Sequence, residues 1–312
     1  MPELVKSGVT ILGIYVCDVA FTATRQPIMG ETIIGQRFAM GPGGKGSNQT
    51  IAAARAGAEV TFITNLGEDL FGDNAMAMYA KDGVIPRVRR VKEVATGAAY
   101  IFLEQGTGSN AIIVVPGAAD TISAADVDNN ADAIRGAAVF MTQLEVPIAQ
   151  AVHALKIAKA AGTTTILNTA PAAAIDDGVY KFCDYVTPNE SEATTMTGVA
   201  VSDLASARKA GDVFLRKGVG AALITLGSQG SLLHTKNTSV HVPVFSAGKV
   251  VDTTGAGDAF NGGFAAALAR GETPEDAARF GSATAGISVT RPGTAPSMPH
   301  LKEIEALLAH SP

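Results

Sequence analysis

The stretch that decides the fold is residues 137–167, which read AAVFMTQLEVPIAQAVHALKIAKAAGTTTIL. Its two ends, 137–141 and 164–167, are short runs of apolar and β-branched residues, which are typical of buried strands. Between them, residues 148–161 place alanine and aliphatic residues at helical spacing. A strand, a helix and a second strand in this order predict a βαβ unit, whose two strands lie parallel in one sheet.

The same alternation continues along the chain. The further strands expected are 9–16, 60–64, 184–186 and 221–225, and the further helices are 47–56, 73–82, 204–217 and most of 258–308. Strands that alternate with helices predict an α/β fold with a mainly parallel sheet covered on both faces. The length of 312 residues fits one large domain or two small ones.

Two segments interrupt this rhythm. Residues 21–40 and 96–115 contain short strand-like runs and turn residues with no helix between them. They are expected to pair as a small separate sheet that covers a site or a partner subunit, because neither can bury its apolar face alone. An antiparallel extension at the edge of the main sheet is the alternative.

Composition excludes several classes of protein. The formal charge is −5, and the longest basic group is the short cluster at 87–92, so no nucleic-acid partner is expected. Cys17 and Cys183 stand far apart in no metal-binding motif, which favours reduced thiols and a cytoplasmic location. No apolar run reaches the length of about 18 residues that a membrane span needs.

A glycine-rich loop at 41–48 reads GPGGKGSN and runs directly into an expected helix. Such a loop brings backbone N–H groups close to a ligand at a helix N-terminus, where Lys45 and Asn48 offer polar contacts. Lys45 precedes Gly46 rather than Ser or Thr, so this is not a Walker A loop. A simple tight turn is the alternative.

The second glycine segment, 252–258, reads DTTGAGD and also opens an expected helix. Small residues at a helix start leave free N–H groups and the positive end of the dipole directed at one spot, which suits phosphate. Asp258 beside that spot is a candidate base for an attacking hydroxyl. Alternatively, Asp258 is a capping residue in the first helical turn. The presence of a second acid in the same loop, Asp252, favours the role of base.

Two further segments carry polar residues after expected strands. Asn189 and Glu192 stand three positions apart in TPNESE at 187–192, a spacing suited to phosphate and hydrated Mg²⁺ or to a capping box. Residues 223–230, LITLGSQG, join two strands through glycines and form either a nucleotide-binding wall or a hairpin.

In their order and spacing, these segments resemble those of the PfkB-type carbohydrate kinases, which include ribokinase. The resemblance runs from residue 12 to residue 297. It implies a ribokinase-like three-layer fold, a single domain over 1–312, with a central mainly parallel sheet and a small β-sheet lid formed by about 19–41 and 96–115. It also implies phosphorylation of the primary 5-hydroxyl of ribose or 2-deoxyribose by ATP with Mg²⁺.

The resemblance assigns roles to residues of this chain. Asp258 becomes the catalytic base, and the N–H groups of Gly255, Ala256 and Gly257 become the anion hole. The implied sugar contacts are Asp18, Gly43, Gly44, Lys45, Asn48 and Glu145. The implied nucleotide contacts are Asn189, Thr225, Gly227, Gly230 and Ser282. The implied ligands of an activating K⁺ are Asp252, Thr254, Ser288, Arg291, Gly293 and Ser297. The lid also implies a homodimer contact.

One position departs from the ribokinase pattern. Ribokinases typically carry Asn two positions before the sugar-binding Asp, whereas this chain has Val16 before Asp18. Deoxyribokinases of the family also carry an apolar residue there. Because valine offers no hydrogen bond, we expect the pocket to tolerate or prefer a sugar with one hydroxyl fewer, such as 2-deoxyribose, or a differently substituted furanose.

Two other functions remain open from the sequence. A nucleoside kinase of the same superfamily needs a surface on which a base can stack, and the candidates for it are Phe21 and Tyr100. A sugar-binding protein that has lost its chemistry is the second, but the presence of Asp258, Lys45 and Asn48 argues against it.

Overall fold

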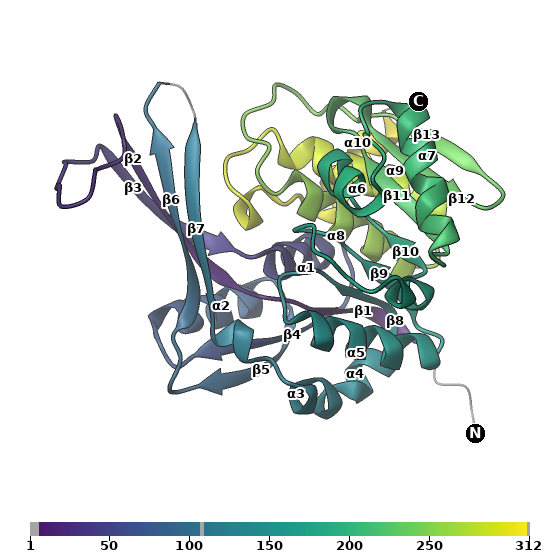
Figure 1. Ribbon diagram of the computed structural model, residues 1–312, viewed down its shortest axis with the longest axis horizontal. Coiled ribbons are helices and arrows are strands. Elements are labelled where there is room, and N and C mark those ends of the chain that lie inside the picture. Colours follow the sequence, from purple (N-terminus) through teal and green to yellow (C-terminus); the bar gives the residue numbers. More distant parts are fainter. Residues whose placement is uncertain (1–5, 107–108, 311–312) are drawn as a thin grey trace.

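The computed structural model describes residues 6–106 and 109–310 and contains two separate sheets (Figure 1). Over this part of the chain, the larger sheet has the strand order β13-β12-β11-β10-β9-β8-β1-β4-β5. In sequence order its strands are β1 (Ser7–Leu12), β4 (Val60–Gly67), β5 (Ile85–Val91), β8 (Ala137–Thr142), β9 (Thr164–Leu167), β10 (Tyr185–Val186), β11 (Ala221–Thr225), β12 (Ser231–Thr235) and β13 (Ser239–Val242). Neighbours from β5 through β11 are parallel, and β12 and β13 are added antiparallel.

Helices cover both faces of this sheet, as expected. One face carries α1 (Lys45–Arg55), α2 (Leu70–Lys81), α8 (Ala256–Ala269), α9 (Pro274–Ser288) and α10 (Leu301–Ala309). The other carries α3 (Ala124–Asn129), α4 (Ala131–Gly136), α5 (Ile148–Ala160), α6 (Glu190–Thr197) and α7 (Leu204–Arg216). Adjacent strand residues feed opposite cores, since side chains alternate along a strand: on β8, Val139 and Met141 pack in the first core and Phe140 in the second.

The expected strand at 9–16 is wrong in its second half. β1 ends at Leu12, and the chain enters the other sheet at Val16. Between them a Cβ atom on Gly13 would lie 2.6 Å from the Cα atom of Gly46, so the chain can turn here only because both residues are glycines. This close approach sets the start of α1 against the carboxyl end of β1.

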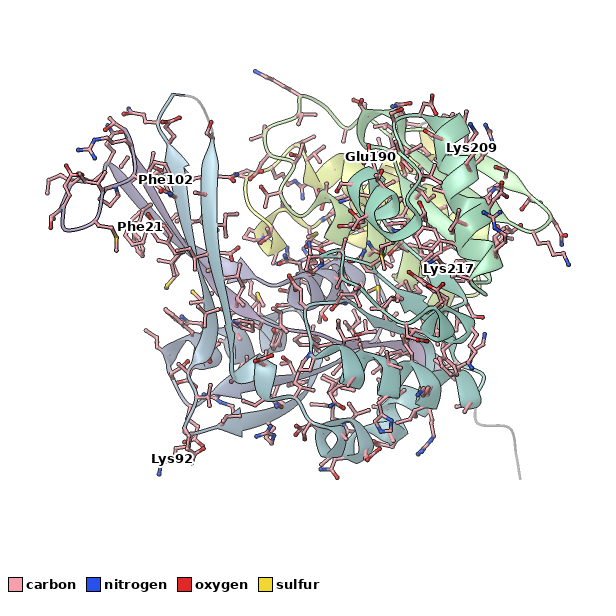
Figure 2. All side chains as sticks on the ribbon, viewed as in Figure 1. Phe21, Lys92, Phe102, Glu190, Lys209 and Lys217 are labelled. Carbon is pink, nitrogen blue, oxygen red and sulfur yellow. The ribbon has the colours of Figure 1, made fainter. Side chains whose placement is uncertain are left out.

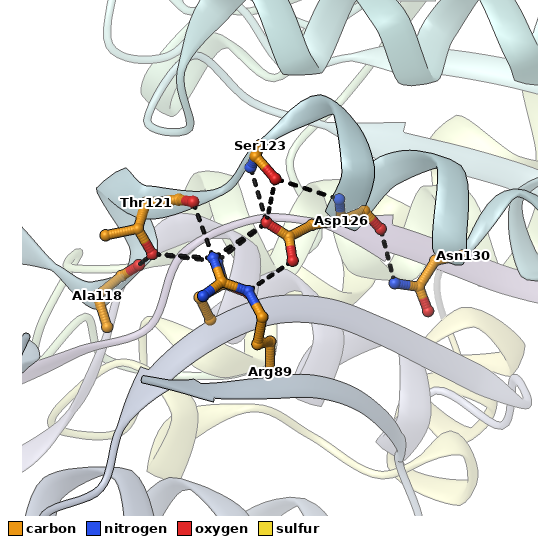
Figure 3. A network of polar contacts seen from close by, with 7 residues as sticks. Arg89, Ala118, Thr121, Ser123, Asp126 and Asn130 are labelled. Carbon is orange, nitrogen blue, oxygen red and sulfur yellow. Dashed lines mark hydrogen bonds and ion pairs between the residues drawn. The ribbon is translucent and has the colours of Figure 1, made fainter. Parts of the chain in front are cut away.

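Strand β5 was not expected, because its arginines hide the apolar alternation. Arg89 pairs with Asp126 at 2.6 Å, and Asp126 also accepts hydrogen bonds from the backbone and hydroxyl of Ser123 at the start of α3 (Figure 3). Arg87 and Arg90 pair with other carboxylates, Asp132 and Asp73. The basic cluster is thus an edge strand tied to nearby acids.

The two interrupting segments form a separate four-stranded sheet, as predicted, and not an extension of the main one. Its order is β3-β2-β6-β7, with β2 (Val16–Ala23), β3 (Arg37–Gly43), β6 (Thr96–Glu104) and β7 (Asn110–Gly117). This small sheet rises away from the body at the upper left of Figure 1. The register places Asp18 on one face of the small sheet and Phe21 on the other. Phe21 is labelled in Figure 2.

The remaining helical segments are short 3₁₀ helices: η1 (Ala118–Thr121), η2 (Asp177–Phe182), η3 (Gly227–Gln229) and η4 (Ala295–Ser297). Among the helices that the structure describes, none is both long enough and apolar enough to cross a membrane.

Candidate active site

The N-termini of α1 and α8 meet at the carboxyl ends of the central strands. Gly255 precedes α8 with φ +77°, a conformation that favours glycine, and the small residues that follow bring the first turn of the helix up to a cavity of about 160 Å³. Ala256, Gly257, Asp258 and Lys45 line this cavity. The N–H groups of a first helical turn carry partial positive charge, which makes the cavity suitable for an anion.

Asp258 lies in that first turn but does not cap the helix. Its two carboxylate oxygens accept hydrogen bonds from α1: Oδ2 from the side-chain amide of Asn48 and Oδ1 from that of Gln49, each at 3.0 Å. Burial raises the pKa of Asp258, while the nearby Lys45 and the two amides act in the opposite direction. The carboxylate is therefore buried, oriented and held beside the helix start.

Two more carboxylates interact with the charge of Asp258: Glu145, in the segment after β8, and Asp18, on β2 of the small sheet. Glu145 accepts a hydrogen bond from the backbone N–H of Lys45 at 2.8 Å, and burial raises its pKa to about 7 against the opposing charge of Lys45. Burial raises the pKa of Asp18 to about 6, and the charge of Asp258 adds to the rise. The charge of Lys45 interacts with Asp258, Glu145 and Glu192, so the surroundings of Asp258 are strongly polar.

The glycine loop lies directly against Asp18. A Cβ atom on Gly43 would lie 2.2 Å from Oδ1 of Asp18, so the carboxylate fits there only beside glycine. Gly44 stands at the start of α1 with φ +86°. Val16 is the register partner of Gly43 and shares the face of Asp18, and it is buried among apolar residues. All six expected sugar contacts are therefore brought to one region of the molecule.

A larger cleft of about 620 Å³ adjoins the small cavity on the other side of the α8 start. Both share Ala256 and Gly257 as lining residues. The cleft is lined by all five residues expected to contact a nucleotide: Asn189, Thr225, Gly227, Gly230 and Ser282. Apolar side chains, among them Val244, Val250 and Phe260, complete its wall.

Asn189 and Glu192 form the capping box that their spacing also allowed. The carboxylate of Glu192 accepts from the backbone N–H of Asn189, and the side-chain oxygen of Asn189 accepts from the N–H of Glu192, both at 2.9 Å. Both residues nevertheless line the cavity that holds Asp258. Burial raises the pKa of Glu192.

The structure brings together part of the set expected to bind a monovalent cation. The carboxylate of Asp252 accepts from the backbone N–H groups of Thr254 and Gly293, both at 2.9 Å, and so joins two loops. Ser297 follows in the second loop, whose Thr294 donates to the carbonyl of Pro42 at 2.7 Å. The side chains of Ser288 and Arg291 turn elsewhere, toward the carbonyl of Ala285 and the carboxylate of Glu303.

Sequence reasoning missed a set of buried polar residues behind Asp258. Gln49, which follows Asn48 in α1, joins Asp258 to further amide side chains on neighbouring strand ends: Gln143 and Asn168. The available signal was the position of Gln49 directly after the glycine loop, at the start of a helix that is otherwise rich in alanine.

A nucleotide-sized cleft that meets a buried, oriented carboxylate at a helix N-terminus defines a small-molecule kinase. Residues 6–301 match the model of the pfkB family of carbohydrate kinases, and the chain belongs to that family, whose members transfer phosphate to an alcohol group.

Two of its relatives are similar over nearly their full length. A ribokinase of Haemophilus influenzae is 37% identical over 98% of this chain and 100% of its own. A deoxyribokinase of Salmonella typhi is 33% identical over 96% of this chain and 98% of its own. The structure of Arabidopsis thaliana ribokinase complexed with ribose and ATP matches with a TM-score of 0.91 and 32% identity, and the match covers 98% of this chain and 100% of that one.

Proposed function

We propose that this protein transfers the terminal phosphoryl group of Mg·ATP to the 5-hydroxyl of a free pentose, ribose or 2-deoxyribose. The observation that carries the proposal is the position of Asp258 in a polar cavity of about 160 Å³ that shares Ala256 and Gly257 with a 620 Å³ cleft. The named ribokinases and deoxyribokinase among its relatives support the same substrate class.

The proposed reaction depends on positioning and charge. The sugar binds between Asp18, Glu145 and the glycine loop, and its primary hydroxyl points at Asp258. The carboxylate of Asp258 accepts the hydroxyl proton as the oxygen attacks phosphorus, and ADP leaves. The N–H groups of Gly255, Ala256 and Gly257 stabilise the charge on the phosphoryl group in transit, in the manner of other preorganised anion sites.

The donor sets fit the two proposed cations. Glu192 lines the cavity, and its carboxylate would hold a hydrated Mg²⁺. Asn189, which lines the same cavity, would offer a polar contact to phosphate. Asp252 ties the loops of Thr254 and Gly293 together. Oxygen donors from these loops and from Ser297, with the backbone carbonyls of Ser288 and Arg291, would suit K⁺. When bound, Mg²⁺ would supply positive charge that offsets the charge of the phosphates, and K⁺ would supply positive charge near the proposed anion hole.

Val16 supports a preference among pentoses. It is buried on the face of the small sheet that carries Asp18, two residues away, and offers no polar atom to a sugar hydroxyl. We therefore propose that the pocket accepts 2-deoxyribose at least as well as ribose.

The two aromatic rings on which a nucleoside base was expected to stack do not face Asp18. Phe21 and Tyr100 contact each other, with ring centroids 5.9 Å apart, and the register places both on the face of the small sheet opposite to Asp18. A base bound beside Asp18 would not reach these rings. This arrangement favours a free sugar.

We also propose that the small sheet is a lid inserted into a single domain and that it joins two copies of the chain. Its face opposite to Asp18 carries large exposed apolar side chains, which we call the outer lid face: Phe21, Phe38, Met40, Ile113 and Val115. A second copy of this face is the proposed partner. The two free, buried cysteines, Cys17 and Cys183, agree with a cytoplasmic location.

The test is release of ADP from Mg·ATP with ribose, 2-deoxyribose, fructose and common nucleosides, each in K⁺ and in Na⁺ buffer. Turnover of a pentose, faster in K⁺ than in Na⁺, is expected. Turnover of nucleosides or fructose alone would contradict the proposed substrate, and equal rates in K⁺ and Na⁺ would contradict the cation site.

A further inference from the structure

A buried row of amide side chains lies behind Asp258. Gln49 is fully buried, and its amide nitrogen donates two hydrogen bonds of 3.0 Å, one to Oδ1 of Asp258 and one to the side-chain oxygen of Asn168. We propose that Gln49 is a positioning residue of the transfer reaction: it fixes the orientation of the Asp258 carboxylate and stabilises the ionised form that accepts the hydroxyl proton. The inference rests on the proposed role of Asp258.

The neighbours of Gln49 leave its amide only one orientation. Its oxygen accepts a hydrogen bond of 2.6 Å from the amide nitrogen of Gln143, while the amide nitrogen of Asn168 donates to the carbonyl of Thr187 at 2.8 Å. A reversed Gln49 would set its oxygen against two acceptors, Asp258 and Asn168. Gln143 and Asn168 therefore hold Gln49 as a donor toward the carboxylate.

The row continues back to the helix that carries Asp258. The hydroxyl of Thr187 donates to the side-chain oxygen of Asn261 at 2.6 Å, and the amide of Asn261 donates to the carbonyl of Gly257 at 2.8 Å. Gly257 and Asp258 are adjacent in the first turn of α8. The same hydrogen-bonded chain thus sets the carboxylate and the proposed anion hole relative to one another.

Most of the charged groups around Asp258 disfavour its ionised form, so hydrogen-bond donors are needed to stabilise that form. The charged groups that face Asp258 come from α1, β2, the segment after β8, and α6: Lys45, Asp18, Glu145 and Glu192. Three of these are acids, and together with burial they oppose ionisation of Asp258. Hydrogen bonds from Asn48 and Gln49 lower the pKa of Asp258 without adding a charge.

The test replaces Gln49 by methionine, which keeps the length of the side chain and removes the donor. The chemical step, measured in a single turnover, is expected to slow by about 10- to 100-fold, since a hydrogen bond to a buried charge is lost. The KM for the sugar should stay within about threefold of the native value. The acidic limb of the profile of rate against pH should move to higher pH by about one unit, because the pKa of Asp258 rises when the donor is lost.

Thr50→Val is the matched control. Thr50 follows Gln49 on α1 and is fully buried. Within the described part of the chain, its hydroxyl makes one hydrogen bond, to the carbonyl of Gly46 at 2.8 Å. Its loss should leave the acidic limb in place. A shift of the limb in Thr50→Val equal to that in Gln49→Met would assign the effect to helix packing and overturn the proposal.

Two further variants keep the proposal testable if Gln49→Met fails to fold. Gln49→Glu retains the shape and replaces the donor by an oxygen, so it should slow the step further and move the limb further. The side chain of Gln143 contacts Gln49 but not Asp258. Gln143→Met should therefore change the rate and the limb in the same direction as Gln49→Met, and it should add little in the double variant. Additive effects would show that Gln143 does not act through Gln49.

An unchanged chemical step and an unchanged acidic limb in Gln49→Met would overturn the inference. So would a slower step that comes only with a lower melting temperature and leaves the limb in place. These outcomes differ from failure of the proposed function, in which Asp258→Asn itself retains the native rate.

Discussion

The proposed preference among pentoses depends on a single residue, Val16. Its place two residues before Asp18 is readable in the sequence, and the structure adds that it lies on the same face and is buried against apolar neighbours. A polar residue at this site can bond a sugar hydroxyl and then discriminates against a sugar without it, because its own polar group is left unpaired.

Val16→Asn should therefore shift selectivity toward ribose. We expect the ratio of kcat/KM for ribose to that for 2-deoxyribose to rise by about tenfold or more. The measurement compares both sugars in the native protein, in Val16→Asn and in Val16→Leu, which remains apolar. A ratio that is the same in all three would remove Val16 from the account of selectivity.

Sugar affinity should depend on pH between 8 and 6. The pKa of Glu145 is about 7 and that of Asp18 about 6, both raised chiefly by burial. Sugar hydroxyls donate best to ionised carboxylates, so protonation below these pKa values weakens binding, by about tenfold at one unit below the pKa of Glu145. Calorimetry in buffers of different ionisation enthalpy should also detect protons released on binding.

Glu145→Gln is the control for that titration. It cannot ionise, so the part of the pH dependence near 7 should vanish while the part due to Asp18 remains. An affinity that is flat from pH 8 to 6 in the native protein would contradict the assignment of these two carboxylates.

Sequence reasoning could find the proposed base, Asp258, but not the residues that support it. Asp258 stands in a glycine segment at a helix start, a local pattern that sequence reasoning can interpret. Gln49 and Asn168 are 119 positions apart and carry no local pattern, and only folding brings them to hydrogen-bond distance.

At the scale of elements, the βαβ units were predictable because their periodicity is local. Strands β9 and β11 have the predicted bounds, Thr164–Leu167 and Ala221–Thr225. Strand β5 was missed because its outward residues are arginines whose acidic partners come from elements distant in sequence. The turn at Gly13 was missed because it depends on contact with Gly46, which the sequence pattern does not show.

The buried ion pair between α1 and the end of α2 should matter for stability. Arg55 pairs with Asp82 at 2.7 Å, with side chains 14% and 6% exposed, and also donates to the carbonyls of Ala295 and Met298. Arg55→Met leaves Asp82 buried and unpaired, so urea unfolding should show a loss of about 3–5 kcal/mol.

The exposed pair of Arg25 and Glu31, with side chains 53% and 29% exposed, offers the comparison. Arg25→Met should cost about 0–1 kcal/mol, because water already screens this pair. Equal losses in Arg55→Met and Arg25→Met would contradict the difference in burial as the cause.

At the scale of the whole molecule, the proposed contact between two copies of the small sheet accounts for an exposed apolar surface that a monomer rarely keeps. The outer lid face carries Phe38 at 59% and Ile113 at 64% exposure. Sequence pattern indicated a separate small sheet but left an extension of the main sheet open. Which face of the small sheet carries Asp18 follows from the register.

The native protein should therefore scatter light as a dimer, and Phe38→Lys with Ile113→Lys should make it a monomer, since charges in an apolar interface are costly. Ile34→Lys is the control, because Ile34 lies at 92% exposure outside the strands of the lid. A native monomer at micromolar concentration would contradict the proposed contact.

The central claim is that Asp258 accepts the proton of the sugar hydroxyl. The most direct test compares Asp258→Asn with the native protein, with the chemical step measured by rapid quench and sugar affinity by calorimetry. Because asparagine fills the same space without a basic oxygen, the step is expected to slow by about 10²–10⁴-fold or more while sugar affinity stays within about threefold. A chemical step at the native rate in Asp258→Asn would contradict the account.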